Sequence, residues 1–189
     1  MGLQLVNDPR LEGADKGLWI EIRGDIARFA GRPALFLDRD GVINADCGYP
    51  SKPSEIVILE SIVPTIKLAN DAGWAVVVVT NQSGIARGYF TWWDFAIVTA
   101  HIDSELGRRG ARLDAVIACG YHESGSSPLD VANHPMRKPQ PGMFIEAQRL
   151  LNIILQRSIM IGDKVTDFEA ANAAGVATVY EPAVSAGHL

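Results

Sequence analysis

The stretch ALFLDRDG at residues 34–41 decides the fold, because four apolar residues run directly into an acidic turn. An apolar run of this length that stops at turn residues is typical of a strand buried on both faces of a parallel sheet. The stretch AVVVV at residues 75–79 repeats the pattern and ends at Thr80 and Asn81. Its β-branched residues suit a central strand, so the two runs predict an α/β fold built on a parallel sheet.

Outward from these runs, short apolar segments alternate with longer helical patterns, as in repeated strand–helix–strand units. Further strands are predicted at 114–118, 158–161 and 177–180. Helices are predicted at 60–72, from the Thr91 cap to about 109, at 141–151, and from the turn at 162–164 to 174. This order predicts a doubly wound sheet in one domain over residues 34–182. Residues 1–33 are interpreted as an extension that packs on the core or covers the site, and residues 183–189 as a tail.

The composition is that of an ordinary folded globule. The chain has 189 residues, of which 48% are hydrophobic and 21% charged, so one domain with a full core is expected. The net charge of −5 argues against binding to nucleic acid or to an anionic membrane surface. Any anionic ligand must therefore be held by a local cluster of basic residues.

The sequence also favours a cytoplasmic location. The N-terminal residues lack the basic and long apolar segments of a signal peptide, and the run at 74–79 is far too short to cross a bilayer. With only Cys47 and Cys119, a disulfide scaffold is not implied and a reducing compartment is expected, although one bridge stays an alternative. We expect a monomer or a weak homo-oligomer.

Four polar clusters each follow a predicted strand, and in a doubly wound sheet the carboxyl ends of the strands share the crevice where ligands bind. The first cluster holds Asp38, Asp40 and Gly41. Because neighbouring like charges push two pKa values apart, one carboxylate can stay ionised while the other carries a proton. We expect Asp38 to attack phosphorus and Asp40 to act as general acid and then general base. Taken alone, the cluster also fits a solvated acidic turn.

The second and third clusters supply hydrogen-bond donors and cations. Thr80 and Asn81, with nearby backbone N–H groups, suit the equatorial oxygens of a phosphoryl group. Lys138 suits a point-charge role beside that group, and the planar guanidinium of Arg137 suits a two-point grip on a second oxyanion. The alternatives are a capped polar turn for the first pair and solvated surface for the second.

The fourth cluster predicts a magnesium site. Asp163 and Asp38, with the main-chain carbonyl of Asp40, provide the oxygen ligands that Mg²⁺ prefers. Asp167 either supports this site or favours the helix start through the helix dipole, and the sequence does not choose between the two. Lys164 is expected to contact the substrate.

Four stretches of the chain, which contain the clusters in order, resemble the four motifs of the haloacid dehalogenase superfamily: FLDRDGVIN, VVVTNQSGIARG, MRKPQPGMF and MIGDKVTDFEAANAAG. More narrowly, they resemble the histidinol-phosphatase and heptose-bisphosphate phosphatase group, over about residues 34–180. The resemblance implies a Rossmann-like core without a large cap domain, and Mg²⁺-dependent phosphomonoester hydrolysis through an aspartyl-phosphate. It also implies a contact between Arg137 and a second phosphate. The roles given above are implied for six residues: Asp38, Asp40, Thr80, Asn81, Lys138 and Asp163.

The chain departs from this group at the positions of a structural zinc site. Where the resemblance implies four ligands, the chain has Cys119, Tyr121, His134 and Met136. His122 could supply a third ligand, but structural zinc normally needs four. We therefore do not expect zinc, and we interpret Cys119 as a small buried hydrophobe.

The predicted substrate is a small phosphorylated metabolite, first a heptose bisphosphate or similar sugar phosphate. Histidinol phosphate or another small phosphate is the alternative. A phosphate-binding module without catalysis is disfavoured, because an acidic residue beside the nucleophile would not improve the binding of phosphate. Substrate contacts are sought in the loops 44–53, 84–90 and 120–136, where Tyr49, Arg87, Tyr121, His122 and His134 are either contacts or exposed loop residues.

Overall fold

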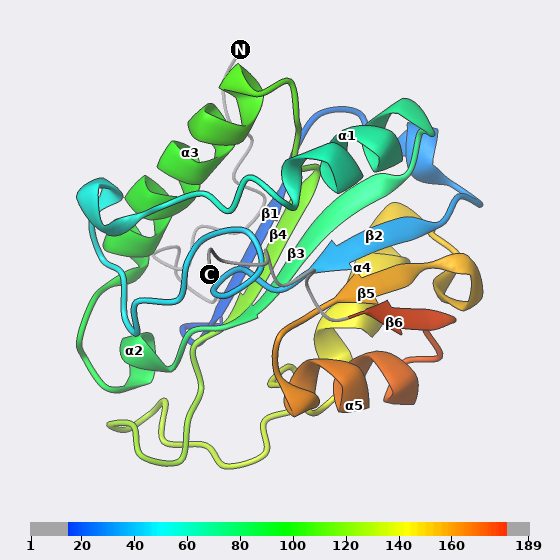
Figure 1. The fold of residues 1–189 in the computed structure, drawn as a ribbon. Coiled ribbons are helices and arrows are strands. Elements are labelled where there is room, and N and C mark those ends of the chain that lie inside the picture. The colour runs from blue at the N-terminus through cyan, green and yellow to red at the C-terminus, as the bar shows by residue number, and fades with distance from the viewer. Residues whose placement is uncertain (1–14, 181–189) are drawn as a thin grey trace, which may run out of the picture.

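A six-stranded sheet lies between two layers of helices in the computed structural model, which describes residues 15–180 (Figure 1). The strand order is β1-β4-β3-β2-β5-β6, with β2 to β6 parallel. The predicted doubly wound α/β sheet is therefore confirmed. The predicted tail at 183–189 and residues 1–14 of the predicted extension lie outside the described residues.

The predicted strands are present with small changes of boundary. The strands are β1 (Leu18–Ile22), β2 (Ala34–Leu37), β3 (Ala75–Asn81), β4 (Ala115–Cys119), β5 (Ile159–Ile161) and β6 (Thr178–Tyr180). β3 runs two residues beyond its predicted end, because Thr80 and Asn81 pair with Ala118 and Cys119 of β4. The polar residues of the second cluster are therefore held by the sheet itself.

The predicted helices are also present. They are α1 (Val63–Asp71), α3 (Trp92–Arg108), α4 (Gly142–Leu151) and α5 (Val165–Ala173). A short helix that was not predicted, α2 (Ser83–Ala86), lies in the loop after β3. The prediction started α1 too early, since the helix begins where a proline occupies its first turn. The Thr91 cap is confirmed: its side chain accepts a hydrogen bond from the N–H of Asp94. No helix within residues 15–180 has the length and apolar character needed to cross a membrane.

β1 is a strand that the sequence pattern did not predict. It comes from the N-terminal extension and pairs antiparallel with β4, from Leu18 opposite Cys119 to Ile22 opposite Ala115. Its residues alternate in burial, and Trp19 belongs to the hydrophobic core. The extension thus supplies the edge strand of the sheet that carries the candidate site.

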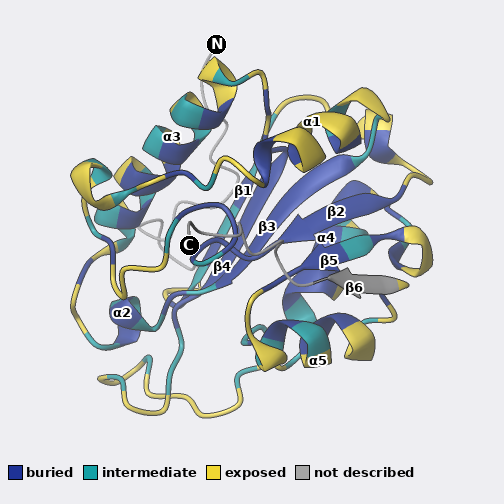
Figure 2. Cartoon of the chain, viewed as in Figure 1, coloured by how far each residue is buried: buried dark blue, intermediate teal, exposed yellow. Residues whose placement is uncertain are grey.

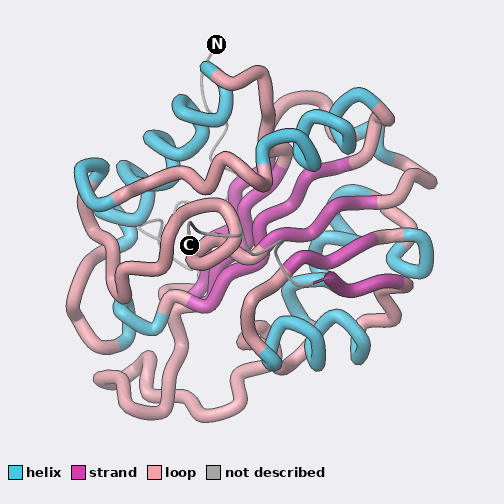
Figure 3. Tube along the Cα trace, in the orientation of Figure 1, coloured by secondary structure: helices cyan, strands magenta, loops and turns pink. Residues whose placement is uncertain are grey.

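Alternate residues of the strands pack into two separate core layers. Figure 2 shows the central strands as buried, between helices that are exposed on their outer sides. Leu35 and Leu37 face the layer that includes residues of α1 and α3, whereas Ala34 and Phe36 face the layer with α4 and α5. This period of two is the reason why both faces of a central strand must be apolar. The loops that follow the parallel strands gather at one end of the sheet (Figure 3), and the site lies there.

Candidate active site

Lys138 joins the ends of two neighbouring strands. Its ammonium lies 3.0 Å from Oδ1 of Asp38, the residue after β2, and donates a hydrogen bond of 2.8 Å to the carbonyl of Val79 in β3. Asn81 holds the backbone of Lys138 through both ends of its amide, at 2.9 and 3.1 Å. The lysine is 2% exposed, so its charge must be paired, and Asp38 is a partner.

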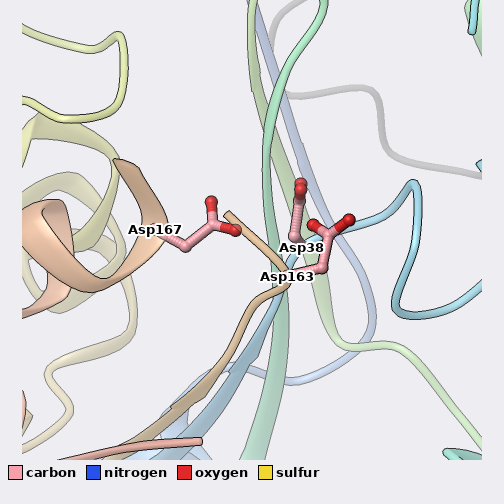
Figure 4. A group of neighbouring side chains, drawn as sticks. All are labelled: Asp38, Asp163 and Asp167. Atoms are coloured by element: carbon pink, nitrogen blue, oxygen red, sulfur yellow. The ribbon is translucent and has the colours of Figure 1, made fainter. Parts of the chain in front are cut away.

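Three carboxylates meet beside this lysine (Figure 4). Asp38 follows β2, Asp163 lies in the turn after β5, and Asp167 lies in the first turn of α5. Their oxygen atoms come within 4.8 Å of one another. Gly41 allows this approach, because a Cβ at that position would overlap Oδ2 of Asp163.

Asp167 contacts both the lysine of the cluster and the start of α5. Its Oδ1 lies 2.5 Å from the ammonium of Lys138, and its Oδ2 accepts a hydrogen bond of 3.1 Å from the N–H of Lys164. The fully buried carboxylate thus supports the site and also caps α5.

The cluster carries more negative than positive charge. Burial raises the pKa of Asp38, Lys138 opposes that shift, and Asp167 adds to it. Burial also raises the pKa of Asp163, with Lys164 opposing and the other two carboxylates adding. Oxygen ligands with an excess of negative charge fit a hard divalent cation such as Mg²⁺.

Asp40 lies in a different environment from Asp38. Arg39 donates two hydrogen bonds to its carboxylate, at 3.0 and 2.6 Å, and Asn44 and Gln82 donate one each, at 3.0 and 3.2 Å. Burial alone would raise the pKa of Asp40, but the charge of Arg39 and these hydrogen bonds outweigh it, so the pKa is lowered. These directions are the opposite of the predicted division, in which Asp38 stays ionised and Asp40 carries a proton.

Arg39 and Gln82 are site residues that the sequence did not reveal. The guanidinium of Arg39 is buried, with its carbon 5.5 Å from the centroid of the Phe95 ring. Gln82 links Asp40 to the hydroxyl of Thr80, to which it donates a hydrogen bond of 2.9 Å. The available signal was the position of an arginine between two acids directly after a buried strand.

Arg87 and Arg137 form a second group of cations, and Arg137 directly precedes Lys138 in the chain. Arg87 and His122 contact each other at 3.3 Å between Nη2 and Nε2, and Nε of Arg87 is buried without a hydrogen-bond partner. Burial lowers the pKa of Arg137, and the charge of Arg87 lowers it further. A cavity of about 240 Å³ adjoins this group, and its lining includes His122, Glu123, Asn133, Arg137, Lys138 and Thr166.

Lys164 lies at the rim, apart from these arginines. Its ammonium is 3.4 Å from a carboxylate oxygen of Asp46, and its side chain is half exposed. Burial would lower the pKa of Lys164, but the charges of Asp38, Asp163 and Asp46 outweigh burial and raise it.

Two of the candidate zinc ligands, His134 and Cys119, lie in different surroundings. The ring of His134 stacks on Tyr121 with centroids 4.0 Å apart, and its Nδ1 accepts from the N–H of Met136. Cys119 is a free buried thiol whose pKa is raised by burial to about 11. Over residues 15–180, the three aspartates above are the one group of three potential metal ligands that converge.

Comparisons with known proteins cover most of the chain. A family model described as HAD-hydrolase-like matches residues 135–180. The D-glycero-beta-D-manno-heptose-1,7-bisphosphate 7-phosphatase of Mesorhizobium japonicum is 52% identical over 163 residues, which are 86% of this chain and 75% of that protein.

Two solved structures are also similar. A protein from Mesorhizobium loti described as a HAD-like phosphatase has 52% identity and a TM-score of 0.83, over 85% of this chain and 77% of the other. The D,D-heptose 1,7-bisphosphate phosphatase of B. bronchiseptica, in complex with magnesium and phosphate, has 31% identity and a TM-score of 0.69, over 77% and 78% of the two chains.

Proposed function

The chain belongs to the HAD-like phosphatases, and we propose that it hydrolyses the 7-phosphate ester of D-glycero-β-D-manno-heptose 1,7-bisphosphate. One observation carries the choice of substrate: the cavity beside Lys138 is also lined by Arg137. A substrate with a single phosphate needs only the group around Asp38 and Lys138. A bisphosphate also uses the second group of cations.

Asp38 is the proposed nucleophile. In the first half-reaction it attacks phosphorus, the bond between phosphorus and the ester oxygen breaks, and an aspartyl-phosphate forms. Lys138, which lies 3.0 Å from Asp38, offsets the charge of the incoming phosphate. The hydroxyl of Thr80 and nearby backbone N–H groups bind the equatorial oxygens.

Asp40 moves the protons. It gives a proton to the leaving oxygen, then takes one from the water that attacks phosphorus and releases inorganic phosphate from Asp38. The lowered pKa of Asp40 keeps it ionised in the free site. Because a phosphate dianion nearby favours the protonated form of a carboxylate, we expect the enzyme to take up a proton when it binds substrate.

Asp38 and Asp163, with the main-chain carbonyl of Asp40, would hold Mg²⁺. When bound, the ion neutralises charge on the nucleophile and polarises the phosphoryl group. The convergence of Asp38, Asp163 and Asp167 supports this assignment, since one oxygen of each lies within 4.8 Å of the others. Lys164 at the rim contributes a further positive charge toward the substrate.

The second phosphate is assigned to Arg137 and Arg87. Arg137 lines the cavity, and Arg87 contacts His122, which lines it as well. Nε of Arg87 is buried without a partner, which costs free energy, and an oxyanion bound beside His122 would supply an acceptor. Asn81 supports substrate binding by holding the backbone of Lys138 through two hydrogen bonds.

A phosphatase panel with Mg²⁺ tests the proposal. It should contain the heptose bisphosphate, histidinol phosphate and a sugar monophosphate, with wild type, Arg137→Ala and the exposed control Arg108→Ala. We expect the highest kcat/KM on the heptose bisphosphate, and a fall of about tenfold or more with Arg137→Ala, as for a lost charge-assisted hydrogen bond. A preference for histidinol phosphate that Arg137→Ala leaves intact would select the alternative substrate.

We further expect a cytoplasmic monomer or weak homo-oligomer without nucleic-acid or membrane partners. The net charge of −5 supports the absence of polyanionic partners. Cys47 and Cys119 are both free thiols, which fits a reducing compartment.

A further inference from the structure

Residues 15–17 are attached to the rest of the molecule by several hydrogen bonds. The hydroxyl of Tyr121 donates to Oδ1 of Asp15 at 2.6 Å, and the N–H of Gly17 donates to the same oxygen at 2.9 Å. The indole of Trp92 donates to the carbonyl of Lys16 at 2.8 Å. The N–H of Gly120 donates to the carbonyl of Gly17 at 2.7 Å. The segment before β1 is thus joined to the start of the loop 120–136.

The ring of Tyr121 fits closely over Gly17. A Cβ at position 17 would overlap three carbon atoms of the ring, so a larger residue there would displace the ring. The ring also stacks on His134, with centroids 4.0 Å apart and an angle of 16° between the planes. Burial and the hydrogen bond to Asp15 raise the pKa of Tyr121 to about 12, so its hydroxyl remains a donor at neutral pH.

Both members of the stacked pair hold Arg137. The guanidinium of Arg137 donates to the carbonyl of Tyr121 at 3.0 Å, and the backbone N–H of Arg137 donates to the carbonyl of His134 at 2.8 Å. Both acceptors are main-chain carbonyls of the two residues whose rings stack, so the stacked pair is connected to the arginine at its side chain and at its backbone.

We propose that Tyr121 is a positioning residue for Arg137, and that Asp15 and Gly17 brace it from outside the loop. The N-terminal segment then serves substrate recognition without touching the substrate. The effect of Tyr121 on kinetics rests on the proposed function, because Arg137 must bind the second phosphate. The effect of Tyr121 on the structure does not rest on it, since the stack either orders the backbone at Arg137 or leaves it unaffected.

Hydrogen exchange tests the brace in the absence of substrate. In Gly17→Ala and Tyr121→Ala, the amide protons of Gly120 and Arg137 should exchange at least about tenfold faster, while those of β3 keep their protection. Gly107→Ala is the matched control, because a Cβ there meets nothing within 4 Å. Unchanged protection at Arg137 in both brace variants would overturn the proposal, whatever the substrate is.

Kinetics test the effect on recognition. The measured quantity is the ratio of kcat/KM for the heptose bisphosphate to kcat/KM for p-nitrophenyl phosphate, which has one phosphate. We expect Gly17→Ala and Tyr121→Ala to lower this ratio about tenfold, mainly through KM. Tyr121→Phe, which keeps the ring and loses the hydroxyl, should restore most of it.

A double variant separates the two proposals. If Tyr121 acts through Arg137, then Tyr121→Ala lowers the ratio no further in an Arg137→Ala background. An additive fall would contradict the positioning role while the second-phosphate site stands. If Arg137→Ala alone leaves the ratio unchanged, the second-phosphate site of the proposed function fails. Hydrogen exchange is then the test of whether Tyr121 positions Arg137.

Discussion

The two ends of the sheet both bury a carboxylate, but they balance its charge in opposite ways. At the amino end of β4, Asp114 accepts hydrogen bonds from Arg28 at 2.7 Å, Arg112 at 2.9 Å and the N–H of Val76 at 3.0 Å. One buried carboxylate there has two guanidinium partners. Its lone pairs are taken up by the protein itself.

At the carboxyl end of the strands the proportion is reversed. Asp38 and Asp167 share the ammonium of Lys138, and Asp163 lies within the same cluster. A buried charge without full compensation costs free energy, and such groups concentrate at functional sites. The excess of carboxylate over cation, rather than burial, therefore distinguishes the end of the sheet with the candidate site from the structural end.

The largest effect is expected from removing the nucleophile. Asp38→Asn keeps the shape of the side chain but has no charged oxygen to attack phosphorus, so phosphatase activity should fall to the background rate. Circular dichroism should show the fold intact, and Asp71→Asn, an exposed aspartate on α1, should keep wild-type turnover. Near-normal activity of Asp38→Asn would place the chemistry elsewhere.

The next effect concerns proton transfer. Asp40→Asn should lower kcat by roughly 10²–10⁴, the usual contribution of a positioned acid and base. A phosphate ester with a good leaving group, such as p-nitrophenyl phosphate, needs less protonation and should lose less in the first half-reaction. An equal loss of the phosphorylation rate for good and poor leaving groups would argue against Asp40 as the acid.

Removing the buried cation should damage stability as well as activity. Lys138→Met leaves Asp38 and Asp167 without their shared partner, which should cost about 3–5 kcal/mol of unfolding free energy in urea. Mg²⁺ should restore part of that loss. Lys67→Met, an exposed change on α1, should stay within about 0.5 kcal/mol. A stable Lys138→Met protein without Mg²⁺ would mean that the carboxylates are not charged.

A substitution at the structural end of the sheet, where Asp114 lies, should lower stability without lowering turnover. Asp114→Asn should cost about 1–3 kcal/mol of stability, because it weakens the bonds to Arg28 and Arg112. Turnover of the folded fraction should match wild type. A loss of turnover without a loss of stability would show that this end also serves the reaction.

The smallest effect we expect is a difference in pH dependence. The pKa of Asp38 is raised on folding by burial, so its charge disfavours the folded state and stability falls as pH rises from the unfolded toward the folded value. In Mg²⁺-free buffer at pH 7, Asp38→Asn should therefore have a higher Tm than wild type. The difference should vanish below about pH 4, where a free Asp is protonated.

Asp40→Asn should have the opposite sign. The pKa of Asp40 is lowered on folding, so its charge stabilises the fold above the unfolded pKa and that contribution is lost as pH falls through the folded value. At pH 7 this variant should be less stable than wild type. Equal Tm shifts for the two variants would contradict the contrast between the two carboxylates.

The sequence predicts the parallel strands well, because short apolar runs of β-branched residues such as AVVVV are typical of buried central strands. It does not predict β1, since a five-residue edge strand is defined by its partner β4, more than 90 residues away in the chain. The four clusters could be located because the carboxyl ends of parallel strands meet at one edge.

The partners within the site are harder to predict. Arg39 reads as part of an acidic turn, and only its burial against Phe95 shows that it must pair with Asp40. The contacts of Tyr121 with residues 15–17 are likewise tertiary, since they join segments about 100 residues apart. No local pattern in the sequence encodes such pairs.

The central claim is that Asp38 carries the phosphoryl group, and chemical trapping tests it most directly. Enzyme quenched during turnover is reduced with borohydride, which converts an acyl phosphate to homoserine, and the peptides are sequenced by mass spectrometry. We expect homoserine at position 38 and at no other aspartate. Turnover that yields homoserine at another position, or no homoserine at all, would contradict the assignment of Asp38 as the nucleophile.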